Sequence, residues 1–235
     1  MISIPATNQR HVHLAKVPRR HSRFAPWERT FFEASAREVA SSLLGHWLVR
    51  NTPEGPSGGI IVETEAYLAD DAASHGYRGE TARNRAMYGP PGRAYIYFIY
   101  GNHWCFNAVC RPAGVAEAVL VRALEPALGQ EWMQVRRSVS KPRDLASGPA
   151  KLCQALDIDG RLDGIDLCNS GSPVFLARHK SHQEVLLEMG PVVATTRIGL
   201  SKAAELPLRF YLAGSQHVSK PGSGSTVKRI SSFDL

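Results

Sequence analysis

The sequence contains no long run of apolar residues. None of its 235 residues lies in an apolar stretch approaching the roughly 18–20 residues that a membrane-spanning helix requires. The first residues include basic side chains, but no apolar segment adjoins them as in a secretory signal peptide. We therefore expect a protein that is neither secreted nor inserted in a membrane, and that resides in the cytoplasm (the bacterial nucleoid) or the nucleus.

Cysteine is scarce, and its spacing fits no metal site. No two of the four cysteines form a Cys-x-x-Cys pair, and no second cluster supplies the spacing of zinc ligands. This argues against a zinc-binding module and favours reduced, mostly buried thiols. The cysteines are Cys105, Cys110, Cys153 and Cys168.

Acidic residues are outnumbered by basic ones. The 28 lysines and arginines against 21 aspartates and glutamates give a formal net charge of +7, and the pI is about 9.4. A basic surface favours a polyanionic partner, which would be DNA, RNA or an anionic membrane. A soluble protein that is basic for no such reason is the alternative.

The chain length and composition indicate one domain with flexible ends. A hydrophobic fraction of 43% is enough for one sizeable core. Residues 1–26 are polar and basic without clear periodicity, which predicts a flexible arm. Residues 217–235 contain the run Lys-Pro-Gly-Ser-Gly-Ser, which predicts a flexible tail. The domain is thus expected to span residues 27–216.

Strand and helix patterns alternate without a βαβ rhythm, which predicts an α+β fold. A helix is expected at residues 34–44, ending before Gly45, and a second at 147–156 with Ser147 as its N-cap and Pro149 in the first turn. A β-hairpin is expected at residues 94–110, with its tip near residues 100–103. Further strands are expected at 58–68, 116–124 (closed by Glu125-Pro126), 192–198 and 208–212.

Two carboxylates are predicted to share one face of the strand at residues 58–68. Alternate side chains of a strand point to the same side, so Glu63, Glu65 and Tyr67 should lie together. A buried carboxylate on such a face is a candidate general base for water. Two alternatives stay open: solvated or ion-paired glutamates on an edge strand, or a metal site completed by Asp70, Asp71 and His75 in a metal-dependent nuclease.

The predicted hairpin is rich in aromatic residues. Tyr95 and Tyr97 should share one face, and Phe98 and Tyr100 the other. An aromatic side chain at the turn of a hairpin suits insertion between base pairs, and those further back suit stacking on an extruded base, although each could also pack in the core.

Arg122 lies in an otherwise apolar strand and needs a partner, either a surface carboxylate such as Glu125 or a catalytic glutamate.

In these segments, the chain resembles the alkyladenine (3-methyladenine) DNA glycosylase family, which removes alkylated and deaminated purines. No single segment is decisive, but their order and spacing over residues 31–214 make the resemblance specific. The matching segments are Val62-Glu63-Thr64-Glu65-Ala66-Tyr67, Arg83-Asn84-Arg85, Pro91-Gly92 through Tyr100-Gly101, Arg122-Ala123-Leu124-Glu125-Pro126, Ser147-Gly148-Pro149-Ala150-Lys151-Leu152 and Pro207-Leu208-Arg209-Phe210-Tyr211.

The resemblance implies roles for particular residues. It implies that Glu65 is the general base that activates the attacking water, and that Arg122 and the backbone carbonyl of Ile198 help to hold this water. It also implies that Asn107 disfavours normal guanine through the exocyclic amino group, and that Tyr100 fills the gap left in the duplex. The residues that would sandwich the flipped base are Tyr67, His75 and Tyr97.

The resemblance further implies a single α+β domain with a curved antiparallel sheet, flanking helices and a protruding hairpin. It implies a monomer that acts on double-stranded DNA containing damaged purines, uses no metal or cofactor, and leaves an abasic site because it has no lysine nucleophile. The loop between Tyr67 and His75 is one residue shorter than in mammalian members, and the hairpin tip is more polar, with Asn102-His103. The basic segment 178–182 has no match in the family and is either a loop near DNA or without a role. A damage-binding module without catalysis is a third hypothesis, beside the glycosylase and the nuclease.

Overall fold

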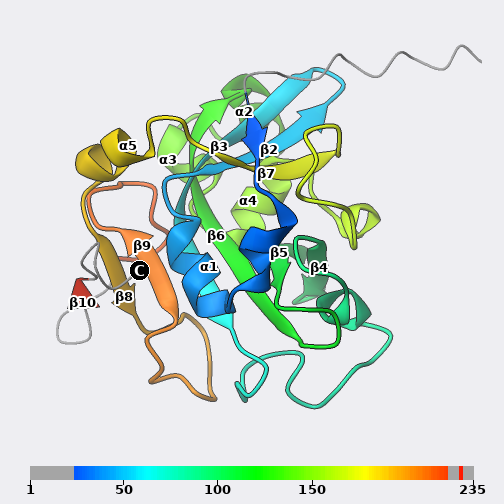
Figure 1. Ribbon diagram of the computed structural model, residues 1–235. Coiled ribbons are helices and arrows are strands. Elements are labelled where there is room, and N and C mark those ends of the chain that lie inside the picture. The colour runs from blue at the N-terminus through cyan, green and yellow to red at the C-terminus, as the bar shows by residue number, and fades with distance from the viewer. Residues whose placement is uncertain (1–23, 222–227, 230–235) are drawn as a thin grey trace, which may run out of the picture.

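The computed structural model describes residues 24–221 and 228–229. Within these residues, the strands form one curved antiparallel sheet in a single α+β domain, as predicted (Figure 1). The strands are β1 (Ala25–Pro26), β2 (Trp47–Thr52), β3 (Gly55–Tyr67), β4 (Ala94–Ile99), β5 (His103–Cys110), β6 (Glu117–Leu128), β7 (Val174–Arg178), β8 (Val192–Thr195), β9 (Arg209–Leu212) and β10 (Lys228–Arg229).

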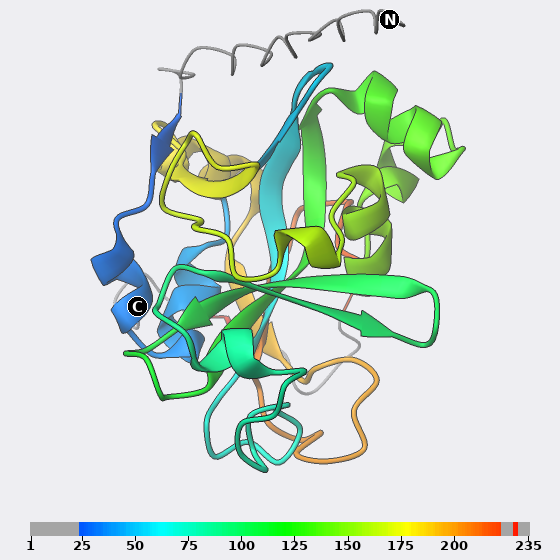
Figure 2. The ribbon, with the colours of Figure 1, turned by 90° about the vertical axis from the view of Figure 1, so that its right-hand side faces the viewer.

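Short helices cover both sides of the central strands. Figure 2 shows α1 on one side of β3 and β6, and α2, α3 and α4 on the other. In the described part of the chain, no helix is long and apolar enough to cross a membrane. The α-helices are α1 (Ala36–Ser42), α2 (Gln130–Arg137), α3 (Pro142–Leu145), α4 (Pro149–Ala155) and α5 (His182–Met189), and the 3-10 helices are Arg29–Glu33, Arg85–Tyr88 and Gly160–Leu162.

Strand β3 is the centre of the sheet. It pairs with β6 along one edge, and along the other edge with β2 and then with β9. Gly58 and Gly59 allow this close packing. A Cβ atom on Gly58 would lie 2.2 Å from the Leu48 carbonyl oxygen, and one on Gly59 would lie 2.1 Å from the Glu125 carbonyl oxygen. The β-branched residues that follow these glycines supply fully buried side chains to the core.

Helix α1 forms where the sequence predicts a helix, but it is shorter at both ends. Ser35 and Glu38 form a capping box, so the helix begins at Ala36 rather than at residue 34. Leu43 is the C-cap, and Gly45 follows with a φ of +79°, a conformation that favours glycine. Thr64 of β3 faces this helix and donates its hydroxyl to the Ala40 carbonyl at 2.8 Å.

Other predicted element ends also differ from the structure. Helix α4 is capped by Gly148 rather than Ser147, because Ser147 forms a β-bridge with Ala123. Strand β6 continues through Pro126 to Leu128, since this end of the strand still pairs with β3. Strand β8 ends at Thr195 and leaves Ile198 in a loop, where its backbone contacts β3 instead of continuing the ladder.

The hairpin of β4 and β5 is confirmed and extends away from the body of the molecule (Figure 2). Its turn comprises residues 100–102, and both Tyr100 (φ 55°) and Gly101 (φ 73°) adopt the left-handed conformation that a tight turn requires. Tyr100 is 81% exposed, so it projects from the tip.

The ends of the domain are partly packed against the sheet. The predicted arm and tail lie largely outside the described residues, but Ala25 and Pro26 pair with β7, and Val218 is buried beside β8 and β9. The basic segment 178–182 also packs on the body. The His179 ring stacks on Trp47 at 5.3 Å, and the His182 ring stacks on His46 at 3.9 Å.

Candidate active site

A cavity of about 310 Å³ lies on the side of the sheet that carries α4, at the lower end of the roughly 300–1,000 Å³ typical of ligand pockets. Four residues that lie opposite one another on neighbouring strands form a row across β3, β6, β5 and β4 beside the cavity. Glu65 pairs with Leu120, Leu120 with Asn107, and Asn107 with Tyr95. Partners in such a row point to the same side of a sheet. Of these, Leu120, Asn107 and Tyr95 line the cavity, and Glu65 lies at the end of the row.

Aromatic side chains surround the cavity. The rings of His75 and Tyr97 meet edge to face with centroids 4.5 Å apart, and Tyr95 lies 5.5 Å from Tyr97. The His75 Nδ1 atom is hydrogen-bonded to the Tyr95 hydroxyl at 2.8 Å, and Asn84 holds the loop by donating to the His75 carbonyl at 2.8 Å. Tyr67 lines the cavity from β3, so the three residues expected to contact a base surround one cavity.

Burial keeps the cavity wall electrically neutral near pH 7. It raises the pKa values of Tyr67, Tyr95 and Tyr97 well above that of a free phenol. Partial burial of its ring and the positive charge of Arg83 lower the pKa of His75. The cavity therefore presents neutral aromatic surfaces, apart from the cation of Arg122 at its inner wall.

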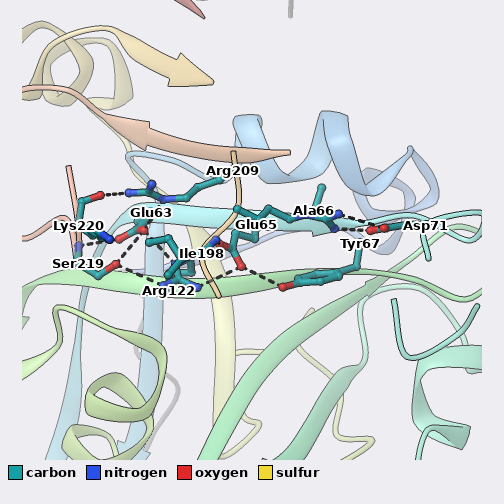
Figure 3. Close-up of polar contacts among 11 residues, drawn as sticks. Glu63, Glu65, Ala66, Tyr67, Asp71, Arg122, Ile198, Arg209, Ser219 and Lys220 are labelled. Carbon is teal, nitrogen blue, oxygen red and sulfur yellow. Dashed lines mark hydrogen bonds and ion pairs between the residues drawn. The ribbon is translucent and has the colours of Figure 1, made fainter. Parts of the chain in front are cut away.

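Glu65 lies directly behind this wall and is fully buried. Its Oε1 atom accepts the backbone N–H of Ile198 at 2.8 Å, and its Oε2 atom accepts the Tyr67 hydroxyl at 3.0 Å. Arg122 forms an ion pair with it, with Nη1 at 3.1 Å from Oε2 (Figure 3). All three partners line the cavity, so only their side chains and backbone separate Glu65 from the space inside.

Glu63 is also fully buried, but its carboxylate is committed to other groups. Its Oε1 atom accepts Arg122 Nε at 2.9 Å, Arg209 Nε at 2.8 Å and the Ser219 hydroxyl at 2.9 Å. The Ser219 backbone N–H donates to Oε2 at 2.7 Å. Four donors saturate this carboxylate, which leaves Glu65 as the glutamate with capacity for another ligand.

Arg122 joins the two glutamates. Burial disfavours its cation, but the negative charges of Glu65 and Glu63 outweigh this and raise the pKa of Arg122. A β-bulge lies at Glu63, where the pairing of β3 with β6 shifts register on both sides of this residue. The partners of Arg122 are therefore two buried glutamates rather than a surface carboxylate such as Glu125.

A second buried ion pair holds the two loops at the cavity. Both Arg197 guanidinium Nη atoms contact the carboxylate of Asp71, and the two side chains are 0% and 1% exposed. Arg197 also donates to the Ala66 carbonyl at 2.9 Å and lies over the Tyr67 ring, 4.7 Å from its centroid. Because Arg197 directly precedes Ile198, these contacts fix the position of Ile198 as well as the Tyr67 ring, whose hydroxyl bonds to Glu65.

These contacts argue against the metal-site alternative. A divalent cation would need the oxygens of Glu63, Glu65 and Asp70 or Asp71 as ligands. Both glutamates are instead bound by Arg122, and Asp71 is bound by Arg197. Among the described residues, no group of three or more potential ligands is arranged for a metal.

Comparison with known proteins identifies the family of this chain. The family model described as methylpurine-DNA glycosylase (MPG) matches residues 30–216. The chain belongs to this family. It is 50% identical to a protein of Methanoculleus marisnigri over 190 residues (81% of this chain and 96% of the relative), and 48% identical to one of Rhodopseudomonas palustris over 193 residues (82% and 87%). Each of these relatives carries the name "Putative 3-methyladenine DNA glycosylase".

The sequence of this methylpurine-DNA glycosylase family member does not predict the contacts that several charged residues make around the site. Arg197, Asp71 and Arg209 are charged residues in loops or at a strand end, where a solvated position is the usual expectation. Ser219 lies beyond the matched region and in the predicted flexible tail. The sequence also does not indicate that the backbone N–H of Ile198 binds Glu65, a contact separate from the predicted role of the Ile198 carbonyl.

Proposed function

We propose that this protein flips an alkylated or deaminated purine out of duplex DNA and hydrolyses its N-glycosidic bond with a water that Glu65 activates. The substrates would be of the 3-methyladenine, 7-methylguanine and hypoxanthine class. The observation that carries the proposal is the position of Glu65, buried and held by Arg122, Tyr67 and Ile198 behind the wall of an aromatic cavity.

The cavity can receive a base only if that base leaves the helix. A glycosidic bond inside a duplex is out of reach of a concave pocket, so the nucleotide must rotate outward. Tyr100 supports this step, because it projects from the hairpin tip and Ile99 beside it lines the cavity. We propose that Tyr100 inserts into the duplex and fills the gap, which offsets part of the cost of unstacking.

The neutral aromatic wall suits an electron-poor base. Stacking on aromatic side chains stabilises an extruded base by roughly 1–3 kcal/mol. A methylated, cationic purine gains further from the electron-rich faces of the rings of Tyr67, His75 and Tyr97. Asn107 has its amide fixed by a donation from Nδ2 to the Tyr95 carbonyl at 2.9 Å, so it can present a rigid edge against the exocyclic amino group of guanine.

The proposed reaction transfers one proton to Glu65. The water oxygen forms a bond to C1′ of the sugar, the bond between C1′ and the base nitrogen breaks, and the base leaves with the electron pair. A carboxylate has about four acceptor sites, and the three donors around Glu65 leave one for this water. The anion of Glu65 also favours positive charge on the sugar in the transition state. Among the described residues that line the cavity there is no lysine that could form a Schiff base, so the product would be an abasic site.

A single-turnover assay tests the proposal. The substrate is a duplex with one hypoxanthine, incubated with enzyme in EDTA and then treated with alkali to cleave abasic sites. Strand breaks that appear only after alkali are expected for hydrolysis without metal or lyase chemistry. Breaks before alkali would contradict the monofunctional mechanism. No product on hypoxanthine or on methylated DNA would favour a damage-binding module.

Glu65→Gln is the matched variant for the same assay. General base catalysis contributes about 10²–10⁴-fold, so the excision rate should fall by at least about 100-fold. Binding to the duplex should change little, because Glu65 is buried behind the wall and gives no charge to the surface. Excision at the wild-type rate by this variant would refute the assignment of Glu65 as the base.

A further inference from the structure

The chain returns to the buried glutamates after β9. Val218 is 3% exposed and packs with Val193 of β8 and Tyr211 of β9, which anchors the segment just before Ser219. Figure 3 shows Ser219 and Lys220 beside Glu63, on the opposite side of this carboxylate from Tyr67. These residues lie beyond the region matched by the family model, which ends at residue 216.

Ser219 gives Glu63 two of its four donors. Its backbone N–H and its hydroxyl bind different oxygens of the carboxylate, at 2.7 and 2.9 Å. The same hydroxyl oxygen accepts Arg122 Nη2 at 3.5 Å. The neighbouring Lys220 carbonyl accepts a hydrogen bond from Arg209, the other arginine on Glu63.

From these contacts we propose that Ser219 is a positioning residue for base excision, which holds Glu63 and Arg122 in the orientation that pairs Arg122 with Glu65. The inference rests on the proposed function, in which Glu65 activates the water. Ser219 touches neither Glu65 nor the cavity in the described structure, so it would act through Arg122.

Each nitrogen of the Arg122 guanidinium has a partner from a different residue. Nε binds Glu63, Nη1 binds Glu65 and Nη2 contacts Ser219. The guanidinium is planar and rigid, so partners on two of its nitrogens determine where the third points. Ser219 therefore contributes to the orientation of Nη1 on Glu65 both directly and through Glu63.

Removal of the Ser219 hydroxyl should disturb this arrangement without leaving Glu63 unpaired. Glu63 would keep its arginines, while Arg122 Nη2 would lose its partner. Arginine favours a two-bond pairing with one carboxylate. The free nitrogen can turn toward Glu63, and this rotation draws Nη1 away from Glu65.

The first experiment compares Ser219→Ala, Ser219→Thr and the matched control Ser215→Ala under single turnover with saturating enzyme. Ser215 lies on the same segment, and its hydroxyl contacts Glu125 at 3.5 Å, outside the cluster. Misplacement by about 1 Å costs up to about 100-fold in rate, so Ser219→Ala should slow excision about 10- to 100-fold, with unchanged DNA affinity and an altered dependence of the rate on pH. Ser219→Thr, which keeps the hydroxyl, should restore most of the rate, and Ser215→Ala should match the wild type.

Ser219→Ala at the wild-type rate with an unchanged pH profile would overturn the inference. A loss that appears equally in Ser215→Ala, or that follows a fall in melting temperature or DNA affinity, would also overturn it in favour of a structural role. The second measurement does not depend on activity: the NMR resonance of the Arg122 Nε–H should shift in Ser219→Ala and not in Ser215→Ala. A wild type without excision would refute the proposed function, while this resonance would still test the positioning.

Discussion

Replacing Arg197 by methionine should destabilise the protein more than most single substitutions. Arg197 is fully buried and bonds to Asp71 and to the carbonyls of Ala66 and Ala203. Methionine fills similar space but leaves the buried Asp71 carboxylate without its cation. Breaking a buried ion pair in this way costs about 3–5 kcal/mol. At about 2–4 °C per kcal/mol for a domain of this size, the melting temperature should fall by about 6–20 °C.

Urea unfolding at pH 7 and calorimetry would measure this change, with the double variant Asp71→Asn/Arg197→Met as the matched control. The double variant removes the unpaired charge, so it should recover at least half of the lost stability. A cost below about 1 kcal/mol for Arg197→Met would refute the reasoning, because it would fall in the range of a solvent-exposed pair. A double variant as unstable as the sum of its single variants would show that the two groups do not interact.

Two further predictions concern Tyr100 at the hairpin tip and the buried His46. Tyr100→Ala should slow excision about fivefold or more, since it removes stacking of roughly 1–3 kcal/mol. The salt dependence of DNA binding should stay equal to that of the wild type, and a larger loss of binding than of excision would contradict the role in flipping. Burial, together with the nearby His182, lowers the pKa of His46 to about 3, so the folded state resists protonation of this ring. The stability that neutral His46 contributes is present above its unfolded pKa of about 6.5 and is lost as the pH falls from there toward 3, by up to about 1.4 kcal/mol per pH unit. Urea midpoints between pH 7 and pH 4.5 should fall less steeply in His46→Gln, and parallel slopes would show that His46 does not contribute.

Local sequence patterns predict much of the fold. The aromatic and β-branched run at residues 94–110 with Gly101 at its centre predicts the hairpin, and Ser35 with Glu38 marks the start of α1. The ends of elements are set by packing partners elsewhere in the chain. Nothing near Ser147 indicates that it pairs with Ala123, and nothing near Pro126 indicates that β3 continues to hold this strand.

The candidate site shows the same division. Alternation along β3 placed Glu63, Glu65 and Tyr67 on one side of the sheet, and in the structure all three contact one another or Arg122. Which glutamate would be free for chemistry could not be read from that pattern. It depends on Ser219, which lies 156 residues away from Glu63 in the chain. Contacts over such separations leave no local signal, because a serine in a polar tail has the same composition whether it is packed or solvated.

The row that runs from Glu65 through Leu120 and Asn107 to Tyr95 has a practical consequence for redesign. Adjacent strands lie about 4.8 Å apart, so the backbone fixes roughly 14 Å between the two ends of this row. A substitution at Asn107 would reshape the middle of the pocket while both ends keep their places. A residue inserted into β5 or β6 would instead turn the following side chains to the far side of the sheet. Libraries that aim to change the accepted base should therefore vary side chains along this row and confine changes of length to the hairpin turn at residues 100–102.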